Sequence, residues 1–354
     1  MPRTNMVKYI FKRILVMIPI LLTVLIITFF LSRLMDILPV IRKVGFHLDR
    51  EELQRLIDVE KKRMGYDLPI YVQLFIYLKN FASGNWGTSY IIDPDEPVLE
   101  FIVSIIPKTI ELMIIPMIIV PIIAVKLGVI SASNKDKSKD TIIRFFAILG
   151  GGFPIFFVAN VLQFFIGKTL VDFTYGEFDF EIIYANTPGL RLEGEYYTGF
   201  RLIDSIINND QLYLMDTLIH LILPTIAMSI TSLAGITRQT RSSMLDVLDQ
   251  DYIRTARAKG VLEKNVINKH ALRNALIPTS NLIIGGIAAS LLGSLFIERT
   301  FDYLGFGYYF VSAVFAADYL LINGFLVFSA IIIISGNLIA DVMYTIIDPR
   351  IIYT

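Results

Sequence analysis

Two residue types that often build metal sites, Cys and His, are scarce in this sequence. The chain has no Cys and only three His, which stand far apart as His47, His220 and His270. Thiolates and clustered imidazoles are the usual ligands of protein zinc sites, so no metal centre of that kind is expected. The sequence therefore argues against a Cys- or His-based metal site.

One tripeptide resembles part of a nucleotide site. Gly167-Lys168-Thr169 has the ending of a phosphate-binding loop, but Leu162 stands where that motif requires its first Gly. The tripeptide also ends an apolar segment, whereas the phosphate-binding loop joins a strand to a helix. We therefore expect this chain to have no ATP-binding domain and to bind no cofactor.

The most informative residues lie in one basic segment, Asp251–Pro278. Its first part reads DYIRTARAKG, in which good helix formers follow Asp251 and end at Gly260. We expect Asp251 to be the N-cap residue and Gly260 to take the left-handed position that follows a helix. A second helical stretch is expected to begin near Glu263 and to continue into an apolar segment.

The short helix predicted in this segment combines basic and small side chains. Together with the hinge at Gly260 and the helix that follows, it forms a rigid lever that projects from the membrane. On composition alone, an ordinary basic loop on the cytoplasmic side of a membrane is the alternative.

The composition indicates a membrane protein. Of 354 residues, 55% are hydrophobic and 18% charged, against roughly 45–50% apolar in soluble domains. The mean hydropathy is +0.62. Such a chain has ample apolar surface to bury, which excludes disorder. Its 32 basic residues are balanced by 32 acidic ones, so binding of nucleic acid through bulk basicity is not expected.

Six apolar segments are long enough, or nearly long enough, to cross a bilayer as helices. The second is the weakest, because its uncharged core, Leu112–Val125, is short. The first is longer than the apolar region of a signal peptide and is expected to be retained. We predict an all-α integral membrane protein with six transmembrane helices at about 14–32, 103–130, 145–167, 218–237, 274–297 and 319–345.

The distribution of charge predicts the orientation of these helices. Basic residues gather before the first span, in 134–144 and in 238–275, whereas acidic residues dominate 168–217 and 298–321. The positive-inside rule then places both termini in the cytoplasm. The expected regions are the N-terminus with the first helix (1–35), a first outer loop (36–102), a transmembrane core (103–347) with an acidic outer insert (168–217) and a cytoplasmic coupling loop (238–275), and a cytoplasmic tail (348–354).

The outer regions and the spans contain further polar candidates. Asp49–Met64 has the pattern of an amphipathic helix, and Glu111 is expected to be solvated near the outer membrane interface. Polar residues inside the spans are candidates to line a permeation path, although hydrogen bonding between helices explains them equally well. These candidates are Asn160, Gln163, Asn281, Ser290 and Asn337.

The exact residues of Asp251–Pro278 resemble the cytoplasmic signature loop of ABC-importer permeases, in the oligopeptide, dipeptide and nickel branch. The general motif has Glu-Ala-Ala, three residues, Gly, and later Ile-x-Leu-Pro. Here Arg254-Thr255-Ala256 precede Gly260, and ALIP ends at Pro278. The missing Glu and the longer spacing are both usual in that branch. The resemblance extends over nearly the whole chain, including the motifs at 65–73, 84–89, 107–112 and 348–351, and is strongest to the subunit with the large first outer loop.

This resemblance implies a permease subunit of an ATP-driven, binding-protein-dependent importer in the cell membrane. It implies that loop 251–278 couples closure of ATPase subunits to alternating access, and that the chain is not itself an enzyme because separate subunits hydrolyse ATP. Its short helix would lie in a groove of an ATPase subunit, where its Arg and Lys side chains offer charge-assisted hydrogen bonds to an acidic rim, its Ala residues permit close approach, and Tyr252 and Ile253 pack against the groove. The docking residues implied in this way are Tyr252, Ile253, Arg254, Thr255, Ala256, Arg257, Ala258, Lys259 and Gly260. Because Gly260 sets the end of this helix, we predict that Gly260→Pro or a bulky residue there uncouples ATP hydrolysis from transport. The implied partners are a second homologous permease forming a heterodimer, two cytoplasmic subunits that bind ATP and Mg²⁺, an extracytoplasmic substrate-binding protein and membrane lipid.

Three alternatives remain at this point. The substrate is expected to be an oligopeptide, but dipeptides or nickel chelates are transported within the same branch. An ion-coupled secondary carrier would need ionisable residues in the middle of spans and inverted repeats, and neither is visible. A structural or insertase-like membrane protein would use the basic loop only to set its topology.

Overall fold

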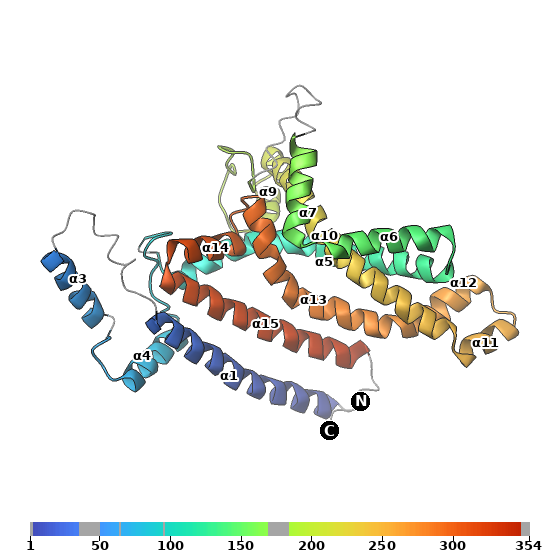
Figure 1. The fold of residues 1–354 in the computed structure, drawn as a ribbon, viewed down its shortest axis with the longest axis horizontal. Coiled ribbons are helices and arrows are strands. Elements are labelled where there is room, and N and C mark those ends of the chain that lie inside the picture. Colours follow the sequence, from blue (N-terminus) through green and yellow to red (C-terminus); the bar gives the residue numbers. More distant parts are fainter. Residues whose placement is uncertain (1–2, 35–49, 64, 95, 169–183, 348–354) are drawn as a thin grey trace. The chain divides into compact units, whose positions relative to one another are not determined.

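A computed structural model describes residues 3–34, 50–63, 65–94, 96–168 and 184–347 of the chain (Figure 1). Within these ranges the chain is helical, and its only strand-like pairing is an isolated bridge between Thr88 and Pro97. The predicted all-α class is confirmed for this part of the chain. The chain forms two compact units, Met1–Pro107 with Gly305–Ser335, and Lys108–Leu304 with Gly336–Thr354.

The first unit contains the N-terminal helix and the first outer loop. Helix α1 packs on α4, where the Thr28 and Tyr77 hydroxyls lie 3.0 Å apart and the Phe29 and Tyr77 rings are 5.6 Å apart. Its helices are α1 (Arg3–Leu34), α3 (Arg50–Arg63), α4 (Ile70–Ala82), the start of α5 (Val98–Ser133), α14 (Phe306–Ala316) and most of α15 (Tyr319–Ile347). The amphipathic helix predicted at 49–64 is confirmed as α3, although its predicted end residues, Asp49 and Met64, lie outside the described residues.

A buried carboxylate holds the first outer loop to the start of α15. Asp318 is fully buried and accepts a hydrogen bond from the Ser89 hydroxyl at 2.7 Å. It also accepts from the backbone N–H groups of Tyr90, Ile91 and Ile92 at 3.0, 2.9 and 3.3 Å. Several N–H donors around one carboxylate compensate for its burial, so this contact fixes the loop.

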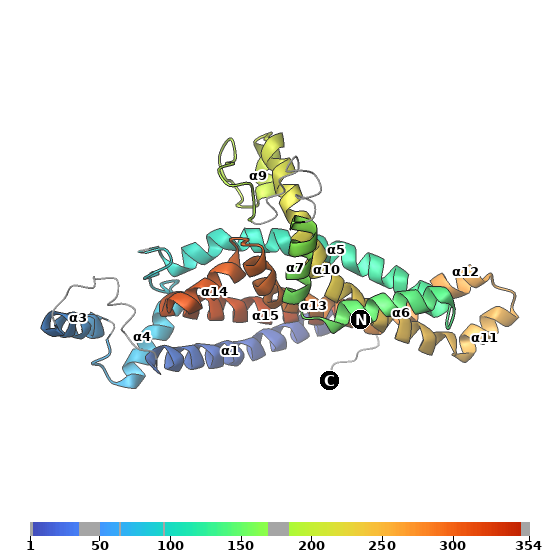
Figure 2. The same ribbon diagram turned by 45° about the horizontal axis from the view of Figure 1, so that its top comes forward.

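The second unit is built around one long helix, α10. It packs against α6, α7, α9 and α13, as can be followed in Figure 2. A Cβ at Gly128 of α5 would lie 2.5 Å from the Thr240 Cβ, so only Gly permits α5 and α10 to approach this closely. The unit comprises the rest of α5, α6 (Ser138–Gly152), α7 (Ile155–Leu162), η1 (Gln163–Lys168), α9 (Arg201–Ile207), α10 (Gln211–Leu248), α11 (Asp251–Ala258), α12 (Glu263–Asn265), η2 (Val266–Ala271) and α13 (Leu272–Thr300).

Four helices of the described residues are long and apolar enough to cross a membrane, namely Ile10–Arg33, Val98–Ser133, Gln211–Leu248 and Tyr319–Val342. They coincide with four of the six predicted spans. A fifth is found if α6 and α7 are taken as one bent span. The predicted span 274–297 lies inside α13, one continuous helix of 29 residues.

The predicted third span at 145–167 is sharply bent in the structure. Helices α6 and α7 meet at an angle of 103°. Phe153 is extended, with φ −104° and ψ 144°, and Pro154 is the N-cap of α7. Proline disfavours the helical conformation in the residue before it and has no N–H to donate, which favours the end of α6 at this point. Proline alone does not require it, since α10 continues through Pro224.

One helix was missed between the last two predicted spans. The outer segment 298–321 contains α14, which begins after Gly305 and ends at Ala317 in the left-handed conformation, with φ 57°. Its sequence, FGYYFVSAVFA, is apolar and aromatic, and its length of 11 residues is too short to cross a bilayer. A prediction based on apolar segments long enough to cross a bilayer therefore does not find α14.

Candidate functional site

The short helix predicted in the basic loop is α11, and its C-terminal end has the expected geometry. Gly260 has φ +76°, the left-handed conformation. Its N–H bonds the Arg257 carbonyl at 2.9 Å, and the Val261 N–H bonds the Ala256 carbonyl at 3.2 Å. These two bonds form a Schellman motif, which satisfies carbonyls that the helix itself leaves free. Gly260 therefore fixes the direction in which the chain leaves α11.

The beginning of α11 differs by one residue from the prediction. The N-cap residue is Gln250, which makes no capping bond with its side chain, and Asp251 is the first residue of the helix. The Asp251 carboxylate instead accepts a hydrogen bond from Arg254 at 3.3 Å. An acidic residue in the first turn interacts favourably with the helix dipole, which gives Asp251 a stabilising role without a cap.

One face of α11 is buried against the chain itself. Ile253 is fully buried, and its hydrophobic cluster contains Met244 of α10 and Ala132 of α5. Val266 and Ala271 of η2 complete the side that faces α11, and Ala256 packs partly against the cluster. The prediction that Ile253 packs against a partner is therefore wrong, because its side chain is used to hold α11 onto the ends of α5, α10 and η2.

The opposite face of α11 is exposed and basic. The Tyr252 hydroxyl accepts a hydrogen bond from Asn274 at 2.7 Å, which joins α11 to α13. The Arg257 guanidinium donates to both oxygens of Glu263, at 2.8 and 3.2 Å, and thereby lowers the pKa of the Glu263 carboxyl. The exposed members of the predicted docking set are Tyr252, Arg254, Thr255, Arg257, Ala258, Lys259 and Gly260.

A buried ion pair, which the sequence reasoning missed, braces the base of this segment. The fully buried carboxylate of Asp140, in α6, accepts from Arg241 Nε at 2.7 Å and Nη2 at 2.8 Å. Ser131 and the backbone N–H of Asp136 also donate to it. The turn between α5 and α6 is thus bonded to α10, two turns before α10 ends at α11. The only sign of this ion pair in the sequence is a charged residue, Asp140, at the start of the apolar helix α6.

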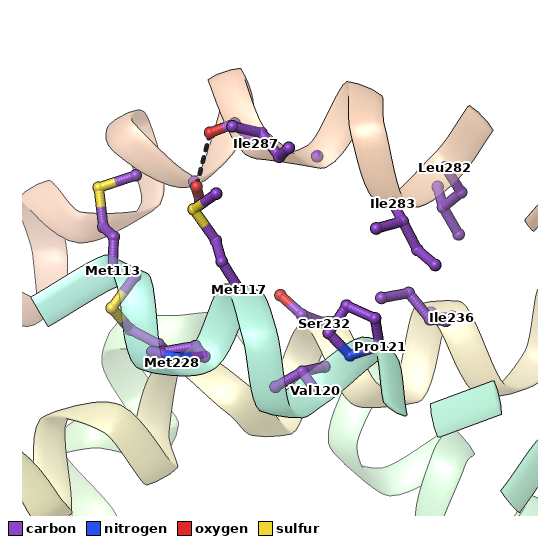
Figure 3. A pocket seen from close by; sticks show the side chains of 14 residues that line it. Met113, Met117, Val120, Pro121, Met228, Ser232, Ile236, Leu282, Ile283 and Ile287 are labelled. Atoms are coloured by element: carbon purple, nitrogen blue, oxygen red, sulfur yellow. Dashed lines mark hydrogen bonds between the residues drawn. The ribbon is translucent and has the colours of Figure 1, made fainter. Parts of the chain in front are cut away.

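An apolar cavity of about 200 Å³ lies between α5, α10 and α13 (Figure 3). Met113 and Met117 of α5 and Met228 of α10 line it, and Figure 3 shows Met117 extending from α5 toward α13. The hydroxyl groups of Ser232 and Ser290 are among its few polar groups. Three of the helices predicted as spans therefore leave an open, weakly polar space between them.

The structure brings one of the five predicted path residues to this cavity. Ser290 lines it and donates a hydrogen bond to the Ile287 carbonyl at 2.6 Å. Asn160 donates to a carbonyl in its own helix and Gln163 to the Thr300 carbonyl, so both bond backbone groups. Asn281 of α13 and Asn337 of α15 are exposed, and neither is among the residues that line the cavity.

A second buried ion pair lies at the end of α10 opposite to α11. Arg201 and Glu111 are each 2% exposed, and their side chains meet at 2.9 Å. The Leu202 N–H donates to the same carboxylate at 2.6 Å, and Arg201 also donates to Asn186 and to the Tyr303 hydroxyl. The expectation that Glu111 is solvated is therefore wrong. Arg201 was missed because its partner is 90 residues away in the sequence.

In the described part of the insert, three carboxylates accept hydrogen bonds from backbone N–H groups. Asp204 and Asp210 each accept two backbone N–H bonds at 2.9 Å, and Asp216 accepts one at 3.1 Å. These bonds lower the pKa of Asp210. Glu193 and Glu195, in contrast, have exposed side chains. The hydrogen-bonded carboxylates therefore help to hold the described part of the insert together and still contribute negative charge.

Comparison with known proteins gives these features their context. Residues 124–353 match the family described as the inner membrane component of binding-protein-dependent transport systems. The chain belongs to this family. It is therefore a multi-pass membrane protein and a permease component of a transport system, and the match includes α10, α11, η2 and α13.

Several characterised permeases are similar along their whole length. The oligopeptide transport system permease protein AppB of Bacillus subtilis is 34% identical, over 98% of this chain and all of that protein. The dipeptide permease DppB of Alkalihalophilus pseudofirmus is 35% identical, again over 98% of this chain and all of that protein. The di/tripeptide permease DppB of Pseudomonas aeruginosa is 32% identical over 98% of this chain and 99% of its own length.

Proposed function

We propose that this permease subunit imports peptides in an ATP-driven complex, and that α11 carries the force from a cytoplasmic ATPase subunit. The observation that supports this most directly is the construction of α11. The helix exposes a basic face, while Ile253 and the Schellman motif at Gly260 fix it to the ends of α5, α10 and η2. A helix held in this way moves together with the spans to which it is bound.

The proposed complex contains the partners that such a component needs. ATP and Mg²⁺ are bound by two cytoplasmic ATPase subunits, and a second, homologous permease completes the path as a heterodimer. An extracytoplasmic binding protein delivers the substrate to the outer loops. The family description, which names binding-protein-dependent transport, supports this assembly.

The proposed topology has six spans: α1, α5, the bent pair α6–α7, α10, α13 and α15, with both termini in the cytoplasm. The turn between α5 and α6 lies at the same end of the second unit as α11, since Ala132 and Ile253 share one cluster. Both were assigned to the cytoplasm from their basic residues, and their proximity supports that assignment. The insert 168–217 and the loop 36–102 then lie outside, and 238–275 and 348–354 lie inside.

The proposed substrate class follows the names of the relatives, which are described as oligopeptide, dipeptide and di/tripeptide permeases. These names differ in the length of the peptide that is transported. Uptake by the reconstituted complex in proteoliposomes, with ATP on the side of the ATPase subunits, tests the proposal across a series from two to about eight residues. We expect ATP-dependent uptake of one part of the series.

Two matched conditions separate this function from its alternatives. Uptake that follows an imposed proton or sodium gradient without ATP would contradict the proposal and favour a secondary carrier. ATP-dependent uptake of nickel chelates with no uptake of any peptide would keep the importer and overturn the peptide assignment.

A further inference from the structure

The cavity between α5, α10 and α13 is kept open by two helical glycines. A Cβ built at Gly235 of α10 or at Gly286 of α13 meets no atom within 4 Å, and both residues line the cavity. Gly in a helix is less favourable than Ala, because it loses more backbone freedom on folding. Close helix packing does not require Gly at these two positions. The absence of a side chain at each position leaves open space in the cavity.

The lining suits apolar groups of varied shape. Met113, Met117 and Met228 border the space, and methionine adapts to different partners because its thioether chain is unbranched and flexible. The Ser290 hydroxyl is already bonded to a carbonyl of its own helix. A charged group would lose its hydration here without gaining an opposite charge, and is therefore disfavoured.

We propose that this cavity receives one apolar side chain of the peptide as it passes through the permease. The proposal rests on the proposed function and adds to it a preference for peptides with an apolar side chain. An apolar cavity of roughly 150 Å³ is known to hold benzene, so the present volume of about 200 Å³ accommodates a leucine or phenylalanine side chain. The cavity thus favours peptides that carry such a side chain.

Filling the cavity from the glycines tests the proposal. The variants are Gly235→Val and Gly286→Val, with Gly286→Ala as a smaller step. Gly152→Val is the matched control, because a Cβ at Gly152 of α6 also meets nothing within 4 Å but Gly152 does not line the cavity. The complex is reconstituted with an unchanged binding protein, and uptake of Ala-Phe-Ala is divided by uptake of Ala-Ala-Ala.

We expect this uptake ratio to fall about tenfold in each Val variant and less in Gly286→Ala, and to stay unchanged in Gly152→Val. A tenfold effect is of the size that a pocket gives when it loses room for one or two methylene groups. Assembly is followed separately by size-exclusion chromatography and by basal ATP hydrolysis of the complex.

Three results would overturn the proposal. One is an equal loss for both peptides, which would make the cavity a general part of the fold or path. Another is no loss for either peptide. The last is an unchanged ratio together with altered stability in lipid, which would assign the space to an acyl chain. Failure of peptide uptake in the wild-type complex would instead refute the proposed function, so the two failures can be told apart.

Discussion

The left-handed backbone conformation of Gly260 bears on the proposed role of α11. Its φ of +76° is unfavourable for any residue with a Cβ, yet a Cβ there would touch nothing. Gly260→Ala therefore introduces about 1–2 kcal/mol of conformational strain without a clash. We expect peptide uptake per ATP hydrolysed to fall at least threefold, because the exit from α11 is no longer fixed.

The outer insert provides a matched control for this substitution. Gly189 has φ +88° and is also surrounded by open space, so Gly189→Ala introduces the same strain far from α11. Uptake per ATP hydrolysed should remain at the wild-type value in Gly189→Ala. Equal losses in the two variants would show that strain alone, and not the position of α11, reduces uptake.

The buried Asp140 carboxylate allows a stability prediction. Asp140→Asn keeps the shape of the side chain but leaves Arg241 without its counter-charge. Removing one member of a fully buried pair costs about 3–5 kcal/mol, and we expect about 2–3 kcal/mol here because Arg241 remains 19% exposed. Thermal unfolding of the purified protein measures this cost.

Asp136→Asn makes the same change of charge in the same turn and serves as the control for Asp140→Asn. Asp136 is exposed and has φ 61°, a conformation that Asn tolerates well. Its substitution should change stability by less than about 0.5 kcal/mol. If the two variants unfolded at the same temperature, the brace between α6 and α10 would contribute nothing.

At the scale of elements, the contact between α11 and α12 has a pH dependence of known sign. Hydrogen bonds from Arg257 lower the pKa of Glu263 from its ordinary value of 4.5. The stabilisation is therefore complete above the unfolded-state pKa and is lost as the pH falls through the lower pKa of the folded state. Both side chains are exposed, which limits its size to about 1 kcal/mol or less.

Titration of Glu263 by carbon-13 NMR in the purified protein checks this sign. The wild-type carboxyl should titrate below 4.5, and Arg257→Gln should bring its pKa back toward that value. Lys264→Gln, which removes a neighbouring charge outside the pair, is the control. A pKa that rises above the ordinary value in wild type would contradict the ion pair.

The helices and their contacts also show how much of the structure could be predicted from the sequence. Hydropathy located α5, α10, α13 and α15, because long apolar runs admit few other structures. The position of Gly260 was predictable because helix ends have a local signature. The buried pairs were not, since Arg201 and Arg241 find their partners 90 and 101 residues away. No local pattern carries that information.

Across the whole molecule, the zero net charge is a balance between segments rich in basic residues, such as 238–275, and segments rich in acidic residues, such as 168–217. Asp204, Asp210 and Asp216 keep their charge but also bind backbone groups, so substituting them would break structural hydrogen bonds. Glu193 and Glu195 have exposed side chains and are therefore the better sites at which to test long-range attraction. We expect their joint substitution by Gln to slow association with a binding protein at low salt by a few-fold, and to have little effect near 0.5 M salt.

Surface plasmon resonance over a salt series measures this association rate. Asp204→Asn provides a contrast, because it should disturb the fold of the insert at every salt concentration. An association rate that does not depend on salt in the wild-type protein would exclude electrostatic steering by the insert.

The elbow between α6 and α7 has a consequence for the lipid around the protein. Where a helix ends, its last carbonyl groups have no partner within the helix, and hydrocarbon offers them none. Phe153 and Gly152 at the 103° bend are exposed in the isolated chain. In the proposed topology, in which α6 and α7 form one bent span, acyl chains cannot cover such a backbone. The annulus of lipid is then interrupted there by water or by a polar protein surface.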